Sequence, residues 1–230
     1  AFIGERISIF MGVRTLTAPY PVEEVPNFYG IAWGKAILLA ICFAFAGALF
    51  CVMLHIFEKQ LKKWFQNPYL RVFVGGVTVV LLWKITGTDT YLGLGGGTIA
   101  QSFAESQKLW VFLLKMLFTC ITLCAGFKGG EIVPSLFIGA TFGSALAPIF
   151  GLPVDICAAC GMVGVFCAVT NSPISSLLIA FELFGFEGVS YYLIAVSISY
   201  AASGYYGLYK DQTIVYSKYK AKYINHHTRM

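Results

Sequence analysis

Charged residues are scarce in this chain, and their scarcity argues against most soluble folds. Aspartate, glutamate, lysine and arginine make up 12% of the 230 residues, whereas hydrophobic residues make up 58%. Ordinary soluble domains carry about 25% charged residues. Four windows contain no Asp, Glu, Lys or Arg, and each is near or above the roughly 20 residues that cross a bilayer as a helix: residues 36–57, 132–154, 156–181 and 188–209. We therefore expect an all-α integral membrane protein with several spans.

The usual marks of a metal site, a disulfide framework or an enzyme are also lacking. The three histidines, at positions 55, 226 and 227, form no metal-ligand pattern, and the seven cysteines are an odd number within apolar segments, which argues against paired disulfides. Cys157 and Cys160 have no second pair to bind zinc, so they are better interpreted as small residues at helix contacts. The glycine-rich stretch 93–97 lacks the lysine of a phosphate loop. We expect no cofactor, no metal and no catalytic activity; an intramembrane hydrolase would need a catalytic pair that is not evident.

Signals for secretion and for nucleic-acid binding are missing too. Nothing near Ala1 resembles a signal peptide, and the start without methionine suggests that a longer parent has lost its amino-terminal part or that the chain was trimmed. The net charge of +5 comes from basic clusters that flank apolar spans, as cytoplasmic ends do. These clusters contain Lys59, Lys62, Lys63 and Arg71 in one case and Lys210, Lys218, Lys220, Lys222 and Arg229 in the other.

Glycine, proline and asparagine divide the rest of the sequence into helices of unequal length. The pattern predicts an exposed loop over residues 14–30 and a membrane domain over residues 1–209. It also predicts a cytoplasmic helix or tail over residues 210–230, where the sequence is polar, basic and aromatic. Short helices that end at Gly or Pro are typical of transporters with discontinuous helices. The expected helices cover residues 2–13, 31–65, 69–87, 99–106, 109–127, 134–150, 154–169, 172–184 and 189–206.

The most informative segment is a charged, glycine-rich bend at residues 126–134, which leads into an apolar helix. In a membrane protein, irregular backbone survives only where it is buried in protein or lines a watery cavity. The N-terminus of the following helix offers unpaired N–H groups and the positive end of a dipole to an anion. The segment therefore predicts an ion site at mid-membrane depth.

Three ionisable residues lie in apolar surroundings, where such groups are costly and usually face a polar pathway or one another. Lys115 could attract an anion or neutralise a carboxylate, but it could equally snorkel or form a structural salt bridge. Glu182 is better interpreted as a structural hydrogen-bond anchor than as a proton carrier. Glu131 lies on the bend itself, where it could be a capping acid or a proton-exchanging, gating carboxylate.

Tyrosines gather near the end of the last span, at positions 205, 206, 209, 216 and 219. A phenolic O–H can donate to an anion without adding charge. Most of these side chains are expected to lie at the membrane interface, and one or two of them to reach an ion.

In these segments the chain resembles the chloride-channel (CLC) family of anion channels and proton-coupled anion exchangers. The family's second half carries a G-x-F-x-P motif at a helix start, and residues 130–134 (Gly-Glu-Ile-Val-Pro) stand in its place. Residues 161–164 (Gly-Met-Val-Gly), residues 171–173 (Asn-Ser-Pro) and the helix ending at Glu182 match further family segments. The likeness covers almost the whole chain, in the family's order.

The resemblance implies the second half of an inverted-repeat CLC-type fold and names a site. Backbone N–H groups of Ile132 and Val133, next to Gly130, would help to hold the central anion. A tyrosine hydroxyl would also coordinate this anion, and Tyr209 is the first choice for that tyrosine and Tyr216 the second. The implied partners are a small inorganic anion, protons in an exchanger, the lipid bilayer, the amino-terminal half and a second copy in a homodimer. The implied location is the plasma (inner) membrane.

Two departures from the family pattern refine this expectation. Ile132 replaces the aromatic residue of the motif, and Glu131 gives the "GGE" form seen in the family's fluoride-exporting branch. The family's G-S-G-I-P and G-K-E-G-P segments, which lie in its first half, are missing, so the chain should be a carboxyl-terminal half that needs the amino-terminal half. We predict chloride as the transported ion, with a fluoride exporter or a non-transporting assembly subunit as alternatives.

Overall fold

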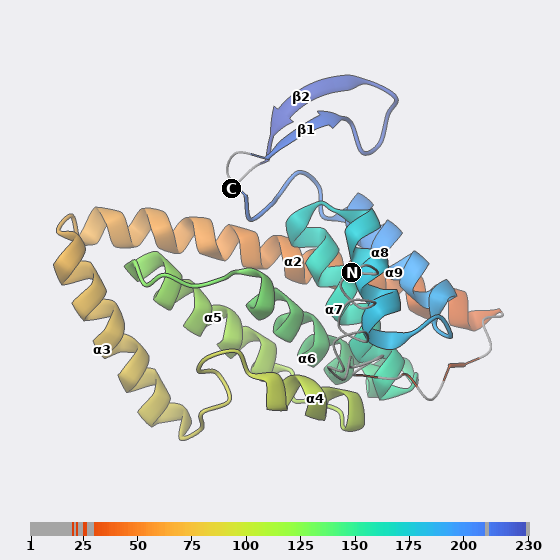
Figure 1. The fold of residues 1–230 in the computed structure, drawn as a ribbon, viewed down its shortest axis with the longest axis horizontal. Coiled ribbons are helices and arrows are strands. Elements are labelled where there is room, and N and C mark those ends of the chain that lie inside the picture. Colours follow the sequence, from red (N-terminus) through yellow and green to blue (C-terminus); the bar gives the residue numbers. More distant parts are fainter. Residues whose placement is uncertain (1–19, 21, 23–24, 27–29, 210–211, 229–230) are drawn as a thin grey trace, which may run out of the picture.

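The computed structural model describes residues 20, 22, 25–26, 30–209 and 212–228. The helix predicted over residues 2–13 and most of the loop predicted over residues 14–30 lie outside these residues. Within them the chain is a bundle of helices of very different lengths, with one small hairpin near its carboxyl end (Figure 1). The predicted all-α membrane fold is confirmed, apart from that hairpin.

Two long helices form a V at one side of the molecule. α2 (Ile31–Trp64) has 34 residues, and α3 (Pro68–Thr86) turns sharply away from its end (Figure 1). The turn follows from local chemistry: proline occupies the first helical position of α3, and the backbone N–H of Tyr69 donates to Asn67 Oδ1 at 2.9 Å. α3 ends at Gly87, whose φ of 64° is the left-handed conformation that glycine adopts without strain.

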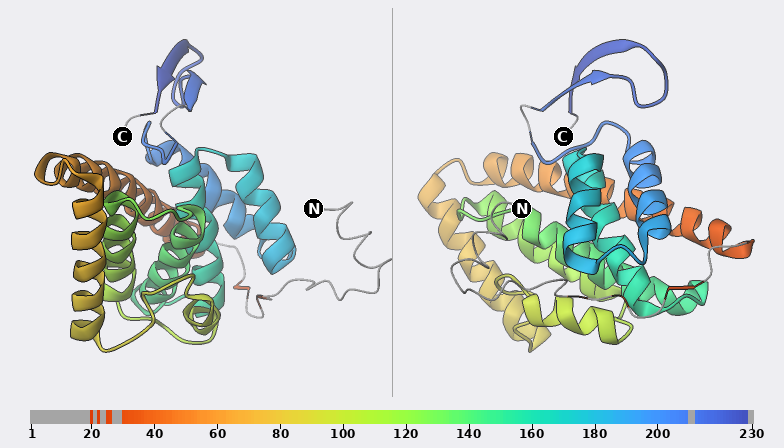
Figure 2. Two further views of the ribbon diagram at one scale, coloured as in Figure 1. Left: turned by 60° about the vertical axis from the view of Figure 1, so that its left-hand side comes forward. Right: turned by 45° about the vertical axis from the view of Figure 1, so that its right-hand side comes forward.

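The remaining helices fill the V and extend beyond it. They are α4 (Gly96–Ala104), α5 (Trp110–Ala125), α6 (Ile132–Phe150), α7 (Val154–Thr170), α8 (Pro173–Phe184) and α9 (Val189–Ala202). α2 crosses this group and packs against α5, α6, α7 and α9, an arrangement that the turned views also show (Figure 2). α7 is the central helix, because all of its residues from 156 to 170 are buried.

The closest contact in the bundle joins α6 to α7 through glycines. A Cβ atom on Gly139 would collide with the backbone carbonyl oxygen of Gly161, and one on Gly143 would collide with that of Cys157. Lipid chains are as apolar as leucine, so helices in a membrane associate through such close backbone approach rather than through the hydrophobic effect. This contact fixes the direction of α6, and therefore the position of its first turn.

The predicted helices agree with the observed ones to within a few residues. Within the part of the chain that the structure describes, three helices are long and apolar enough to cross a membrane, namely α2, α3 and α6, while α5, α7, α8 and α9 are shorter apolar helices. α6 begins at Ile132, two residues before the predicted start at Pro134, because proline is tolerated in the first turn of a helix. α9 ends at Ala202, four residues before the predicted end.

The prediction of a helix at the carboxyl end is wrong for the described residues. β1 (Thr213–Tyr216) and β2 (Tyr223–His227) pair antiparallel, and the hairpin stands clear of the helices in all views (Figures 1 and 2). The reason lies in the sequence, since Thr213-Ile-Val-Tyr216 consists of β-branched and aromatic residues that favour strands. The basic residues between the strands form the turn.

Lys218 in that turn ties the hairpin to the helical bundle. Its ammonium group donates to Asn171 Oδ1 at 2.5 Å, to the carbonyl of Tyr200 at 2.8 Å and to Ser203 Oγ at 3.1 Å. Burial lowers the pKa of Lys218 to about 8. The folded state therefore binds this proton less tightly than the unfolded chain does, and the contribution of Lys218 to stability rises with pH above about 8.

The glycine contact between α6 and α7 yields a stability prediction. Gly143→Ala places a methyl group against the carbonyl of Cys157, and overpacking of this kind costs about 1–3 kcal/mol. We expect a lower midpoint of thermal unfolding in detergent. Gly34→Ala in α2 is the matched control, because nothing lies within 4 Å of the added Cβ. Equal midpoints for the two variants would contradict the role assigned to the contact.

Candidate anion site at the start of α6

The bend between α5 and α6 is built by glycine at one end and by a helix start at the other. Gly126 ends α5 with φ of 113°, and its N–H donates to the carbonyl of Leu123 at 3.1 Å. The chain then runs without helix to Glu131, the residue that precedes the start of α6 at Ile132. The side chain of Glu131 makes no capping hydrogen bond to α6, so the structure does not use this carboxylate as a cap.

The first turn of α6 offers hydrogen-bond donors at the bend. The first N–H groups of an α-helix have no partner within the helix, and here they include those of Ile132 and Val133. Pro134 has no N–H, and the N–H of Ser135 already donates to the carbonyl of Glu131 at 3.2 Å. The donors left for a ligand are therefore concentrated in two adjacent residues at the positive end of a 19-residue helix.

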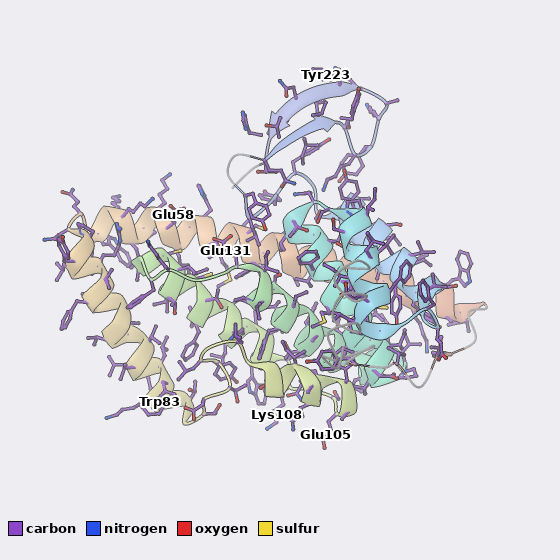
Figure 3. The ribbon with its side chains drawn as sticks, in the orientation of Figure 1. Glu58, Trp83, Glu105, Lys108, Glu131 and Tyr223 are labelled. Atoms are coloured by element: carbon purple, nitrogen blue, oxygen red, sulfur yellow. The ribbon has the colours of Figure 1, made fainter. Side chains whose placement is uncertain are left out.

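A polar cavity of about 220 Å³ lies on one side of the bend and includes Glu131. α2 contributes His55, Glu58 and Lys62 to its wall, and α3 contributes Arg71. Glu58 pairs with Lys62 at 2.6 Å, and both Glu58 and Glu131 are labelled in Figure 3, on neighbouring helices. The cavity therefore gathers acidic, basic and titratable side chains around the start of α6.

The cavity also receives the chain that follows α9. Gly207 and Leu208 line it, and the N–H of Leu208 donates to the carbonyl of Val169 at the end of α7 at 2.9 Å. This bond brings Tyr209, the first-choice tyrosine, next to the cavity wall. The Tyr209 side chain is 44% exposed, while its carbonyl accepts a hydrogen bond from Thr228 Oγ1 at 2.7 Å.

A second cavity, of about 320 Å³, lies on the other side of the bend. Gly129, Gly130 and Pro134 line it together with Lys115 of α5. Lys115 is only 2% exposed, and its ammonium group donates to the carbonyls of Tyr91 at 3.2 Å and Gly93 at 2.8 Å. Lys115 therefore does not snorkel to the surface: it holds the loop before α4 while contributing positive charge to this cavity.

The two cavities share a wall. Leu123 lines both of them, Gly126 and Glu131 face the first, and Gly129 and Gly130 face the second. The bend predicted from sequence as an ion site is therefore a partition between two spaces. A buried cation lies on one side and a carboxylate on the other.

The structure does not bring two of the predicted residues to this point. Tyr216 lies in β1 on the hairpin, is 67% exposed and packs edge-on against Tyr223 with ring centroids 6.0 Å apart. Glu182 is exposed on α8 and lines neither cavity. Tyr216 was the second-choice anion ligand and Glu182 a structural charge. Neither side chain contributes to the two cavities beside the bend.

Sequence reasoning missed the polar wall that α2 presents to Glu131. His55, Glu58 and Lys62 follow one another at spacings of three and four residues, which places them on one face of a helix. That spacing was visible in the sequence as a polar stripe on a long apolar helix. What the sequence could not show is that the stripe faces the bend 70 residues later.

A family model described as voltage gated chloride channel matches residues 1–204. Interrupted apolar helices around a donor-rich helix start are typical of membrane transporters, and the family match is more specific than this general class. The chain belongs to the voltage-gated chloride channel family, as its resemblance to CLC proteins predicted.

Individual relatives agree with the family match. A chloride/fluoride channel protein of Pseudomonas syringae pv. tomato is 38% identical over 225 residues, which are 95% of this chain and 49% of that protein. A putative ion-transport protein of Escherichia coli, YfeO, is 31% identical over 153 residues, 63% of this chain and 35% of that protein. The crystal structure of a CLC-type fluoride/proton antiporter matches with a TM-score of 0.84 at 30% identity, covering 91% of this chain and 53% of that one. The chain thus spans about half the length of these proteins or less.

Lys115 provides the test of this geometry. Lys115→Met keeps the length of the side chain but leaves two backbone carbonyls without their donor, and hydrogen bonds to charged groups contribute about 1.5–3 kcal/mol each. We expect faster amide hydrogen exchange over residues 88–95 and a lower unfolding midpoint. Lys108→Met, at an exposed lysine near the start of the same helix, is the control and should change neither. Unchanged exchange in Lys115→Met would show that the loop is held by other contacts.

Proposed function

We propose that this chain is the carboxyl-terminal half of a CLC-type transporter that moves a small halide, chloride in the first instance, across a membrane. The observation that carries the proposal is the start of α6, where two adjacent N–H donors lie on a partition between two cavities. The chain spans about half of its relatives, so an amino-terminal half would close the pathway from the other side.

The anion would be held by dipoles and neutral donors at this point. The N–H groups of Ile132 and Val133 face it, and Gly130 has open space around its Cα that lets an ion approach the backbone. A tyrosine hydroxyl adds a donor without charge. Tyr209 is the better placed residue, because it follows the cavity-lining Gly207 and Leu208, and Tyr216 would need the hairpin to move. Neutral donors suit transport because binding must be weak enough for the ion to leave.

Glu131 would act as the proton-exchanging or gating carboxylate of this half. It faces a cavity that contains His55, Glu58 and Lys62, all of which can hold or pass protons. When ionised it opposes an anion at the adjacent helix start, and when protonated it removes that repulsion and becomes a donor. Ion binding and proton binding at the bend are thereby coupled. This chemistry needs no cofactor.

Fluoride is the second candidate ion, and two observations favour it. Glu131 gives the bend the form found in the fluoride-exporting branch of the family. In addition, the relatives include a chloride/fluoride channel protein and a fluoride/proton antiporter. Fluoride is the smaller and more strongly hydrogen-bonding halide, so it suits a site made of closely spaced N–H and O–H donors.

The assembly follows from the same proposal. Residues 1–209 would form the membrane domain, residues 210–230 would lie on the cytoplasmic side, and two copies of the complete transporter would pair as a homodimer in the plasma membrane. The basic end of α2, with Lys59, Lys62 and Lys63, places that end at the cytoplasmic surface. A non-transporting assembly subunit is the competing function.

Flux measurements on the full-length parent test the proposal. The parent, reconstituted in liposomes, should release loaded chloride or fluoride when an ionophore dissipates the membrane potential, and a pH gradient should drive the flux if protons are exchanged. Protein-free liposomes are the control. Equal release from both preparations would leave only the assembly function.

Glu131→Gln tests the carboxylate separately from folding. The variant keeps the shape of the side chain but cannot exchange a proton, so we expect the pH dependence of flux to be lost and the chloride-to-fluoride ratio to change. Glu105→Gln, an exposed acid at the end of α4, should behave as wild type. If Glu131→Gln retains both the pH profile and the ion ratio, Glu131 has no part in coupling.

A further inference from the structure

A groove lies between α2 and α3, the two arms of the V, and none of its lining residues lines either cavity of the bend. α3 packs against α5 rather than along α2, and Gly75 brings α3 close to Ala125. The space left between the helices is about 490 Å³. Its walls are almost entirely apolar: Ile56, Phe57 and Leu61 come from α2, Val74 and Thr78 from α3, and Ile121 from α5.

Thr78, a polar residue in the groove, is satisfied within its own helix. The hydroxyl of Thr78 donates to the carbonyl of Val74 at 2.8 Å, so it presents no unpaired donor to the space. Gln60 reaches the groove from the exposed side of α2. An occupant of the inner part must therefore be apolar, since a polar one would lose its hydrogen bonds to water without replacement.

The mouth of the groove, at the end of α2, is basic rather than apolar. Lys59 and Lys63 are exposed and one helical turn apart, and they follow the groove-lining Ile56 and Gln60 by three residues, which makes them neighbours of these side chains on the surface of α2. Lys62 points elsewhere, because it pairs with Glu58 and lines the cavity of Glu131. The groove therefore ends at two lysines that are not part of that ion pair.

Aromatic residues place this mouth at the surface of the bilayer. Trp64 is 68% exposed at the end of α2, and Tyr69 is 85% exposed in the first turn of α3. Tryptophan and tyrosine with exposed rings are enriched at the level of the lipid headgroups. The apolar groove therefore starts at headgroup depth and continues toward the bilayer interior.

We propose that this groove binds an anionic phospholipid, with one acyl chain between α2 and α3 and the phosphate of the headgroup on Lys59 and Lys63. The apolar walls match an alkyl chain, and the two lysines match a net negative headgroup. Each basic residue near an anionic membrane surface strengthens binding about fivefold. The site would select for headgroup charge, and it would do so whichever halide the protein carries.

Native mass spectrometry of the full-length parent in detergent tests the site, with phosphatidylglycerol and phosphatidylcholine of identical acyl chains added in turn. We expect more phosphatidylglycerol than phosphatidylcholine to be retained. Lys59→Gln combined with Lys63→Gln should reduce that preference about 25-fold, fivefold for each lysine, and leave phosphatidylcholine unchanged. Lys84→Gln, at the far end of α3, is the charge control and should retain the preference. Inorganic phosphate should not displace the lipid.

A groove-filling variant separates the acyl chain from the headgroup. Thr78→Phe should reduce retention of both lipids, whereas Val77→Phe, on the same helix but not in the groove, should reduce neither. Equal retention in these two variants would show that another part of the parent, such as its amino-terminal half, covers the groove. Equal retention of the two lipids by the unmodified protein would overturn the headgroup assignment. The double lysine variant lies on the surface, so its result stands even if Thr78→Phe does not fold.

Discussion

The close backbone contact between α6 and α7 is the constraint on which the site depends. Gly139, Gly143 and Gly161 let the two helices approach until a single methyl group would collide with a carbonyl oxygen. Because α7 is buried over nearly its whole length and also packs against α2 and α9, it acts as a fixed support for α6. The start of α6 is thereby held where the chain from α5 and the chain after α9 both arrive.

The polar groups of these helices do not compete with that contact. Ser135, Thr141 and Ser144 direct their hydroxyls to carbonyls within α6, at 2.6–3.1 Å, and Thr170 does the same within α7. Hydroxyl side chains are thus satisfied locally, as membrane interiors require. The N–H donors that remain at the first turn of α6 differ from these hydroxyls for this reason, and they are the donors on which the proposed anion site rests.

Helix boundaries were predicted well from the sequence where proline, glycine or asparagine marks the end of a helix. Asn67-Pro68, Gly87, Gly126 and Gly151 end or begin helices in the structure close to the predicted positions, because their preferred backbone conformations leave few alternatives. The carboxyl-terminal hairpin was missed because basic residues between Tyr216 and Tyr223 masked the strand propensity on both sides. The overall composition of this segment suggested a helix, but its local β-branched and aromatic residues favour the two strands that form.

The candidate site was predictable only as far as local sequence signals mark it. The bend and Glu131 could be found from charge and glycine in an apolar context, and Lys115 from its isolation. The surroundings of Glu131 could not be predicted, because His55 and Arg71 line the same cavity as Glu131 only through the packing of α2 and α3 against α5. Contacts between segments far apart in sequence depend on packing, and no local pattern reports them.

Gly129 and Gly130 form the part of the partition that lines the second cavity, and neither has a side chain to stiffen it. Nothing lies within 4 Å of a Cβ on Gly130, and glycine moves between backbone conformations at little steric cost. A barrier of this kind can open through rotation about a few bonds while α6 stays fixed against α7. In the proposed transporter, the rigid contact between α6 and α7 would therefore set the position of the ion, and the two glycines would set how easily the backbone at that position rearranges.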